Sequence, residues 1–131
     1  MTRFGSPLIM LSVALLQIPQ CCAGETAATE STWRGFARLD FKIDGRDCLL
    51  IQPRDAATGN PWIWRTEFFD HEPQVDLALA ERGFHITYMN VQDMYGSPTA
   101  LDHMDKFYDH LVADRKLSSK AVLEGFSRGG I

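Results

Sequence analysis

The spacing of apolar residues along the chain changes several times, and each change predicts a new element. The first apolar positions with strand-like spacing are Phe36, Leu39, Phe41 and Ile43. A second apolar run covers residues 48–52 and is closed by Pro53, while Asp44-Gly45 between the two runs is a preferred two-residue hairpin turn. The sequence therefore predicts an antiparallel hairpin at the start of the fold.

Further along, the pattern alternates between strand and helix. Residues 61–64 form a short apolar run, and residues 73–83 follow with Pro73 at a first helical position and Gly83 at a helix C-cap. The face of this predicted helix is formed by Val75, Ala78, Leu79 and Arg82. Residues 84–89 are rich in strand-forming side chains.

The second predicted helix begins at Ser97-Pro98, an N-cap followed by proline in the first turn. Its apolar side chains are Leu101, Met104, Phe107 or Tyr108, Leu111 and Val112. Residues 121–125 form a last short strand. From residue 61 onward the order is strand, helix, strand, helix, strand, which favours a parallel sheet covered by helices.

The N-terminus has the order of a secretory signal peptide. Arg3 is followed by an uncharged apolar run at residues 7–18 and by small residues at 22–24, so we expect residues 1–24 to be removed on export to the periplasm or the medium. The run is too short to span a bilayer, for which about 20 residues are needed. A buried helix of the mature protein and a lipoprotein signal are the alternatives. Residues 25–32 are small and polar, and we expect a flexible lead-in there.

Composition adds few constraints. The chain of 131 residues is 45% hydrophobic, which is typical of a globular domain, and we assign residues 33–131 to the N-terminal part of one domain. The net charge of −4 comes without a basic cluster, so a nucleic acid is not an expected partner. Removing the signal also removes Cys21 and Cys22, leaving Cys48, which we interpret as a small buried apolar residue.

The chemistry is concentrated in Gly125-Phe126-Ser127-Arg128-Gly129, which fits the pattern G-x-S-x-G. At a sharp turn from strand to helix, side chains two positions on either side of the serine collide with neighbouring elements, and glycine removes the clash. Such a turn exposes the serine oxygen and directs the next backbone N–H toward the oxygen that becomes negative during acyl transfer. Ser127 is therefore the candidate nucleophile, and we expect its side chain to be exposed at such a turn.

With this motif, residues 33–131 resemble the α/β-hydrolase superfamily of serine esterases, lipases and peptidases. The resemblance implies an α/β fold in which an N-terminal β-hairpin leads into a mostly parallel sheet with flanking helices, here an incomplete α/β-hydrolase fold. It also implies an oxyanion hole formed by the backbone of Arg128 and by a donor in the loop at residues 65–69. That donor is Thr66 or Glu67, and we favour Thr66. The arginine after the serine is also similar to the motif of glucuronoyl esterases.

In the superfamily, an acid and then a histidine follow the serine along the chain. Only four residues follow Ser127, and the histidines at positions 71, 85, 103 and 110 all precede it. We therefore expect an N-terminal fragment that ends just after the nucleophile turn and is inactive by itself. His71 is a candidate substrate contact, and the other three histidines are expected to be structural or exposed to solvent.

The predicted function is that of a secreted serine hydrolase that cleaves an ester, or alternatively an amide, through an acyl-enzyme on Ser127. The expected substrate is a small-molecule, carbohydrate or lipid ester. No cofactor is implied, no metal site is expected because His103 and His110 lack ligand spacing, and no membrane span remains after signal removal. The alternatives are a non-catalytic binding protein resembling α/β-hydrolases and an unrelated nucleotide-binding α/β domain.

The signal-peptide interpretation predicts a defined new N-terminus. When the full-length gene is expressed with export, N-terminal sequencing of the exported protein is expected to begin at Gly24 or Glu25, because the small residues before these positions suit a signal peptidase. Recovery of a soluble product that still begins with Met1 contradicts the prediction.

Overall fold

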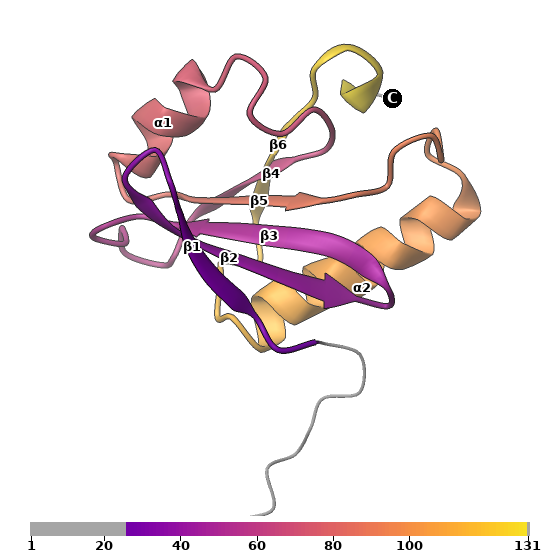
Figure 1. The fold of residues 1–131 in the computed structure, drawn as a ribbon, viewed down its shortest axis with the longest axis horizontal. Helices are drawn as coiled ribbons and strands as arrows, with labels where there is room; N and C mark the ends of the chain where they lie inside the picture. Colours follow the sequence, from indigo (N-terminus) through magenta and orange to yellow (C-terminus); the bar gives the residue numbers. More distant parts are fainter. Residues whose placement is uncertain (1–25, 131) are drawn as a thin grey trace, which may run out of the picture.

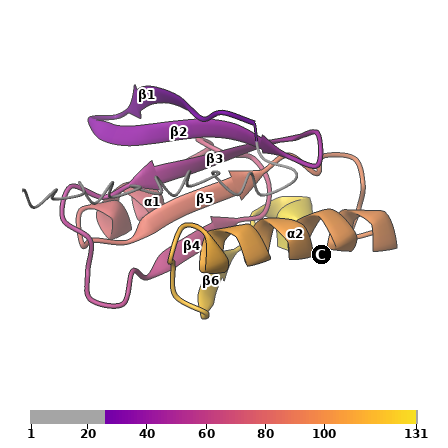
Figure 2. The same cartoon turned by 90° about the horizontal axis from the view of Figure 1, so that it is seen from below.

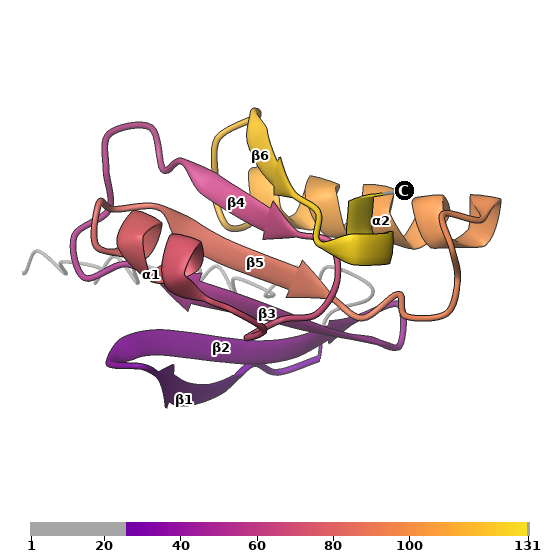
Figure 3. The same ribbon diagram turned by 90° about the horizontal axis from the view of Figure 1, so that it is seen from above.

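A computed structural model describes residues 26–130 of the chain, so the predicted signal peptide at residues 1–24 lies outside the described residues. The described part forms one six-stranded sheet in the order β1-β2-β3-β5-β4-β6 (Figure 1; Figure 3). Its strands are β1 (Thr29–Trp33), β2 (Phe36–Ile43), β3 (Arg46–Gln52), β4 (Trp62–Arg65), β5 (His85–Met89) and β6 (Ala121–Glu124). The helices are α1 (Gln74–Ala80), α2 (Pro98–Ala113) and a short 3₁₀ helix, η1 (Ser127–Gly130).

The expectation of a mostly parallel sheet with flanking helices, as in an α/β-hydrolase fold, is wrong for this sheet. Three neighbouring pairs, β1–β2, β2–β3 and β3–β5, are antiparallel, and only β5–β4 and β4–β6 are parallel. Two α-helices accompany the six strands in the described part of the chain. The alternation of strands and helices does place β4, β5 and β6 parallel, but the longer N-terminal strands make the sheet mostly antiparallel.

Two tight turns fix the antiparallel half. Asp44 and Gly45 join β2 to β3 with φ of 50° and 77°, the left-handed conformations that match the twist of a hairpin. The hairpin predicted from the sequence is therefore present. Arg34 and Gly35 make an equivalent turn, with φ of 47° and 85°, between β1 and β2. Strand β1 includes residues 29–32, for which the sequence predicted a flexible lead-in. The polar residues of this strand are exposed, so they gave no apolar pattern from which a strand could be predicted.

The sheet has an apolar core on each face, and one helix covers each of them (Figure 1; Figure 2). On one face, Phe107 and Leu111 of α2 pack against Trp62 and Trp64 of β4 and Phe41 of β2. The other face is covered by α1 and is formed mainly by Leu49, Ile51, Ile63, Ala80 and Ile86. Burial on both faces explains why β4 reads as the continuous apolar run Trp-Ile-Trp.

Helix α1 presents a different face to the sheet from the one predicted. Val75, predicted to face the core, is 54% exposed, whereas Asp76 and Ala80 are buried. The predicted ends are closer to the structure, since Pro73 immediately precedes the helix and Gly83, with φ of 88°, lies just beyond it. For α2, the predicted cap is present, because Ser97 Oγ accepts a hydrogen bond from Ala100 N at 3.3 Å. Neither α-helix is long and apolar enough to cross a bilayer, within residues 26–130.

The three parallel strands end at the same edge of the sheet. The segments that follow them, residues 66–73 after β4, 90–97 after β5 and 125–130 after β6, therefore gather at that edge (Figure 3). In α/β sheets, ligands bind at the carboxyl ends of the parallel strands. The segment that contains Ser127 is one of these three.

The two edge strands differ in the side chains they expose. Strand β1 exposes polar residues, whereas β6 exposes Val122 and Leu123, the latter to 67%. An unpaired edge that carries apolar side chains is a template for association with another chain.

We therefore predict that a chain of residues 1–131 self-associates through β6 and that Leu123→Lys weakens this association by about tenfold or more, because burying a leucine contributes about 1.5–3 kcal/mol. Sedimentation velocity over a concentration series measures the effect. Val75→Lys, which changes an exposed apolar residue of α1, is the matched control. Equal weakening by both substitutions contradicts a specific role for the β6 edge.

Candidate active site

Ser127 lies in the turn that follows β6, at the first position of η1. Its φ is 52°, a left-handed conformation that costs free energy in a residue other than glycine, and its side chain is exposed. Within the described residues, the Ser127 hydroxyl makes no hydrogen bond. The serine is therefore held in a strained turn with its oxygen open to a ligand.

The two glycines of the motif are needed for close packing. A Cβ added at Gly125 would lie 2.7 Å from the carbonyl oxygen of Gly129 and from the Cα of Gly130, which is backbone that cannot move aside. At Gly129 a Cβ would lie 2.9 Å from Thr66 Oγ1 and 3.1 Å from Glu67 Cβ. The turn is thus packed against itself on one side and against the loop after β4 on the other.

Thr66 fastens this loop to the turn. Its backbone N–H donates to the Glu124 carbonyl at 3.2 Å, and its hydroxyl lies within hydrogen-bond distance of the carbonyls of Glu124 and Gly129. The Thr66 N–H, which we favoured as an oxyanion donor, is therefore already engaged. The Glu67 N–H has no hydrogen-bond partner among residues 26–130, and it lies 3.3 Å from the position of a Cβ on Gly129.

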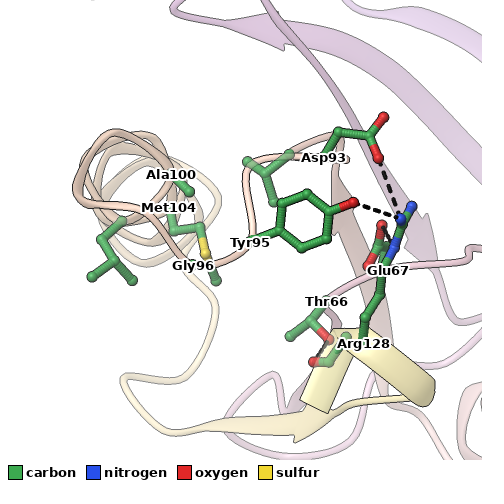
Figure 4. Close-up of a pocket in the computed structure, with 11 residues that line it drawn as sticks. Thr66, Glu67, Asp93, Tyr95, Gly96, Ala100, Met104 and Arg128 are labelled. Atoms are coloured by element: carbon green, nitrogen blue, oxygen red, sulfur yellow. Dashed lines mark hydrogen bonds and ion pairs between the residues drawn. The ribbon is translucent and has the colours of Figure 1, made fainter. Parts of the chain in front are cut away.

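The Arg128 side chain connects η1 to two of the loops at this edge (Figure 4). Its Nε donates to Glu67 Oε1 at 2.8 Å, and its Nη1 lies 3.2 Å from Asp93 Oδ1 and 3.5 Å from Tyr95 Oη. The guanidinium also stacks on the rings of Phe68 and Tyr95. With these contacts, Arg128 acts as a structural clamp, and its charge is largely balanced by two carboxylates.

A small pocket of about 100 Å³ opens beside this clamp. Its polar end is formed by Thr66, Glu67, Asp93 and Arg128, and its apolar end is formed by Val91, Ala100, Leu101 and Met104. Figure 4 places Ala100 and Met104 on α2, across the pocket from Arg128. The pocket therefore combines charged groups near the Ser127 turn with an apolar wall on a helix.

Of the four histidines, only His71 is in contact with the turn. Its ring centroid lies 4.8 Å from that of Phe126, the residue before Ser127. His85 is buried, its Nδ1 lies 3.3 Å from the Pro61 carbonyl oxygen, which can only accept, and burial lowers its pKa. His103 lies 3.2 Å from Asp44, and Nδ1 of His110 lies 2.8 Å from Asp114. These last three histidines are bound to other parts of the scaffold.

One group at this edge was not identified from the sequence: a buried ionic cluster of Arg65, Asp76 and Glu124. Arg65 is paired with Asp76 and lies 3.5 Å from Glu124 Oε1. A signal was present, because Arg65 ends an apolar strand and Asp76 lies in a helix with apolar neighbours, but nothing in the sequence showed that these two residues meet. Among the described residues, no group of three His, Cys, Asp or Glu side chains is arranged to hold a metal ion.

No protein-family model, curated protein or solved structure matches this chain. The interpretation of the site therefore depends on its own geometry.

The close packing of the turn predicts that its glycines are not equivalent. Gly125→Ala and Gly129→Ala are expected to lower the free energy of unfolding by about 1–3 kcal/mol each, because the added methyl groups overlap backbone or loop atoms. Denaturant unfolding measures the change. Gly130→Ala is the control, since a Cβ there meets nothing within 4 Å. Destabilisation of all three variants to the same degree contradicts the prediction.

Proposed function

We propose that the protein is a serine hydrolase that cleaves ester bonds through an acyl-enzyme on Ser127. The observation that carries the proposal is the left-handed φ of 52° at an exposed serine, between a strand and a helical turn, with glycines packed closely on both sides. Backbone strain of this kind clusters at functional sites, because the surrounding structure must maintain it. The resemblance of residues 125–130 to serine hydrolases supports the same assignment.

In the proposed reaction, Ser127 Oγ attacks the carbonyl carbon of the ester and transfers its proton to a base. The alcohol then leaves with a proton, the acyl group remains on Ser127, and water hydrolyses the acyl-enzyme to release the acid. Amides are the alternative substrate class, with an amine as the leaving group.

The oxyanion that forms during attack needs backbone donors. Arg128 N–H follows the nucleophile directly, as such turns require. For the second donor we now propose Glu67 rather than Thr66, because the Thr66 N–H is bound to the Glu124 carbonyl while the Glu67 N–H is available within residues 26–130. The contact between Arg128 and Glu67 holds these two residues together.

The base is not assigned to any of the four histidines described above. His71 is proposed as a substrate contact, since its ring packs on Phe126 beside the serine. A serine hydroxyl without a base is a weak nucleophile, so the residues described here are expected to be nearly inactive by themselves.

The pocket beside the turn, which Arg128 and Gly129 line but Ser127 does not, is proposed to hold a small acyl group. Its small volume of about 100 Å³ favours a short acyl group such as acetyl over a long acyl chain. The leaving alcohol, whether of a small molecule, a carbohydrate or a lipid, would lie outside this pocket. Location in the periplasm or outside the cell belongs to the same proposal.

Supplying the base from solution tests the proposal on the chain itself. We predict that incubation with p-nitrophenyl acetate and imidazole acetylates Ser127 at least about tenfold faster than incubation without imidazole, because imidazole takes the place of a general base that contributes 10²–10⁴-fold in enzymes. Intact-protein and peptide mass spectrometry locate and quantify the adduct over time.

Two variants control this experiment. Ser127→Ala is expected to remove the imidazole-dependent adduct, whereas Ser119→Ala, which removes another exposed serine hydroxyl, is expected to leave it unchanged. Equal acetylation of Ser119 and Ser127, or no increase with imidazole, would show that Ser127 is an ordinary surface serine and would favour a non-catalytic binding protein.

A further inference from the structure

The buried ionic cluster of Arg65, Asp76 and Glu124 lies where the candidate site is joined to the sheet. Arg65 is the last residue of β4 and directly precedes Thr66 and Glu67. Glu124 is the last residue of β6 and lies three positions before Ser127. The Arg65 guanidinium contacts both carboxylates and also donates to the backbone carbonyl of His71, so one side chain connects the loop after β4 to the strand that carries the serine.

The charges in this cluster do not balance when both carboxyls are ionised. One guanidinium then faces two carboxylates, and Arg65 and Asp76 are only 2% and 0% exposed. Two buried carboxylate oxygens, Asp76 Oδ1 and Glu124 Oε2, have no hydrogen-bond partner within residues 26–130 when both groups are treated as acceptors. An uncompensated buried charge is costly, and one proton placed between the carboxyls removes it.

The surroundings of Asp76 support a shared proton. Burial, followed by the hydrogen bond with Glu124, raises the pKa of Asp76 to about 6, although the positive charge of Arg65 acts in the opposite direction. The ionisable groups that face Asp76 are Arg65 from β4 and Glu124 from β6. His71, in the intervening loop, contributes its backbone carbonyl to Arg65 while its ring packs on Phe126.

We propose that Arg65, Asp76 and Glu124 form a positioning unit in which the two carboxyls share one proton, and that losing this proton loosens the loop at residues 66–72 from the Ser127 turn. The structural part of this proposal stands without the proposed function. Its consequence for catalysis depends on Ser127 being the nucleophile, because the loop carries the proposed second oxyanion donor.

The pH dependence follows from linkage. The pKa of Asp76 in the folded protein, about 6, is higher than its ordinary value of 3.8, so protonation favours the folded state. The stabilisation is complete below about pH 4 and is lost as the pH rises through 6. A difference of about two pKa units corresponds to about a hundredfold change in the unfolding equilibrium constant. Asp44 and Asp70 have their pKa lowered by hydrogen bonds to Lys106 and Arg34, so they act in the opposite direction and at lower pH.

The experiment compares denaturant unfolding of the full chain and its variants between pH 4 and pH 8. In the unsubstituted protein the unfolding constant is expected to rise by up to a hundredfold between pH 4 and pH 7. Glu124→Gln, which keeps a neutral hydrogen-bonding partner for Asp76, is expected to reduce that rise to less than tenfold. Glu81→Gln, at an exposed carboxylate just after α1, is the matched control and is expected to keep the full rise. If Glu124→Gln does not fold, Asp76→Asn serves as the second variant, with the same expectation.

Hydrogen exchange of the amides in residues 66–72 and 125–130 gives a second readout. If the cluster were an ion pair without a shared proton, the protection of these amides would not depend on pH. After correction for intrinsic exchange, protection of these amides is expected to fall above pH 6 in the unsubstituted protein and to stay constant in Glu124→Gln. Unfolding constants with the same pH dependence in both proteins, or protection that is independent of pH, would overturn the proposal. Because neither measurement needs acylation of Ser127, failure of the proposed function would be recognised separately.

Discussion

The guanidinium of Arg65 is almost completely removed from water, and such a group is stable only when acceptors surround it. It obtains these acceptors from three separate segments: Asp76 of α1, Glu124 of β6 and the carbonyl of His71. The need of Arg65 for several acceptors therefore constrains the tertiary structure, because no single segment supplies them all. It explains why an acidic residue of α1 faces the sheet while Val75 faces solvent. It also fixes the ends of β4 and β6, from which the Ser127 turn and its neighbouring loop extend.

From these fixed strand ends, the Ser127 turn is maintained by contacts rather than by its own preference. A serine with φ of 52° is strained, and η1 has only four residues. The close approach of Gly129 to Thr66 and the ion pair of Arg128 with Glu67 hold the turn against the loop after β4. Ser127 is one of ten residues other than glycine with a positive φ among residues 26–130, so the functional argument rests on the exposed hydroxyl and the two closely packed glycines together rather than on its φ alone.

The two halves of the sheet have different roles in this arrangement. The antiparallel strands β1 to β3, joined by two left-handed turns, supply much of the core and carry none of the candidate site residues. The parallel strands β4, β5 and β6 are short, but all their carboxyl ends meet at one edge, where the polar loops converge. A fold of this kind does not by itself define an activity, so the functional argument depends on Ser127 and the groups around it.

The sequence by itself determined several local features of residues 26–130. The hairpin turn at Asp44-Gly45, the cap at Ser97, the strands around Ile63 and Ile86, and the glycine-bounded serine were all readable, because each depends on the conformational preferences of a few neighbouring residues. Tertiary structure decided what local preference does not encode. It made the sheet mostly antiparallel, because hydrophobic spacing identifies a strand but not its partners. It added β1, whose exposed polar residues pair with β2 in an antiparallel ladder that no apolar pattern indicated. It turned Asp76 inward and engaged the Thr66 N–H, because both outcomes depend on which distant residue, Arg65 or Glu124, lies opposite in space.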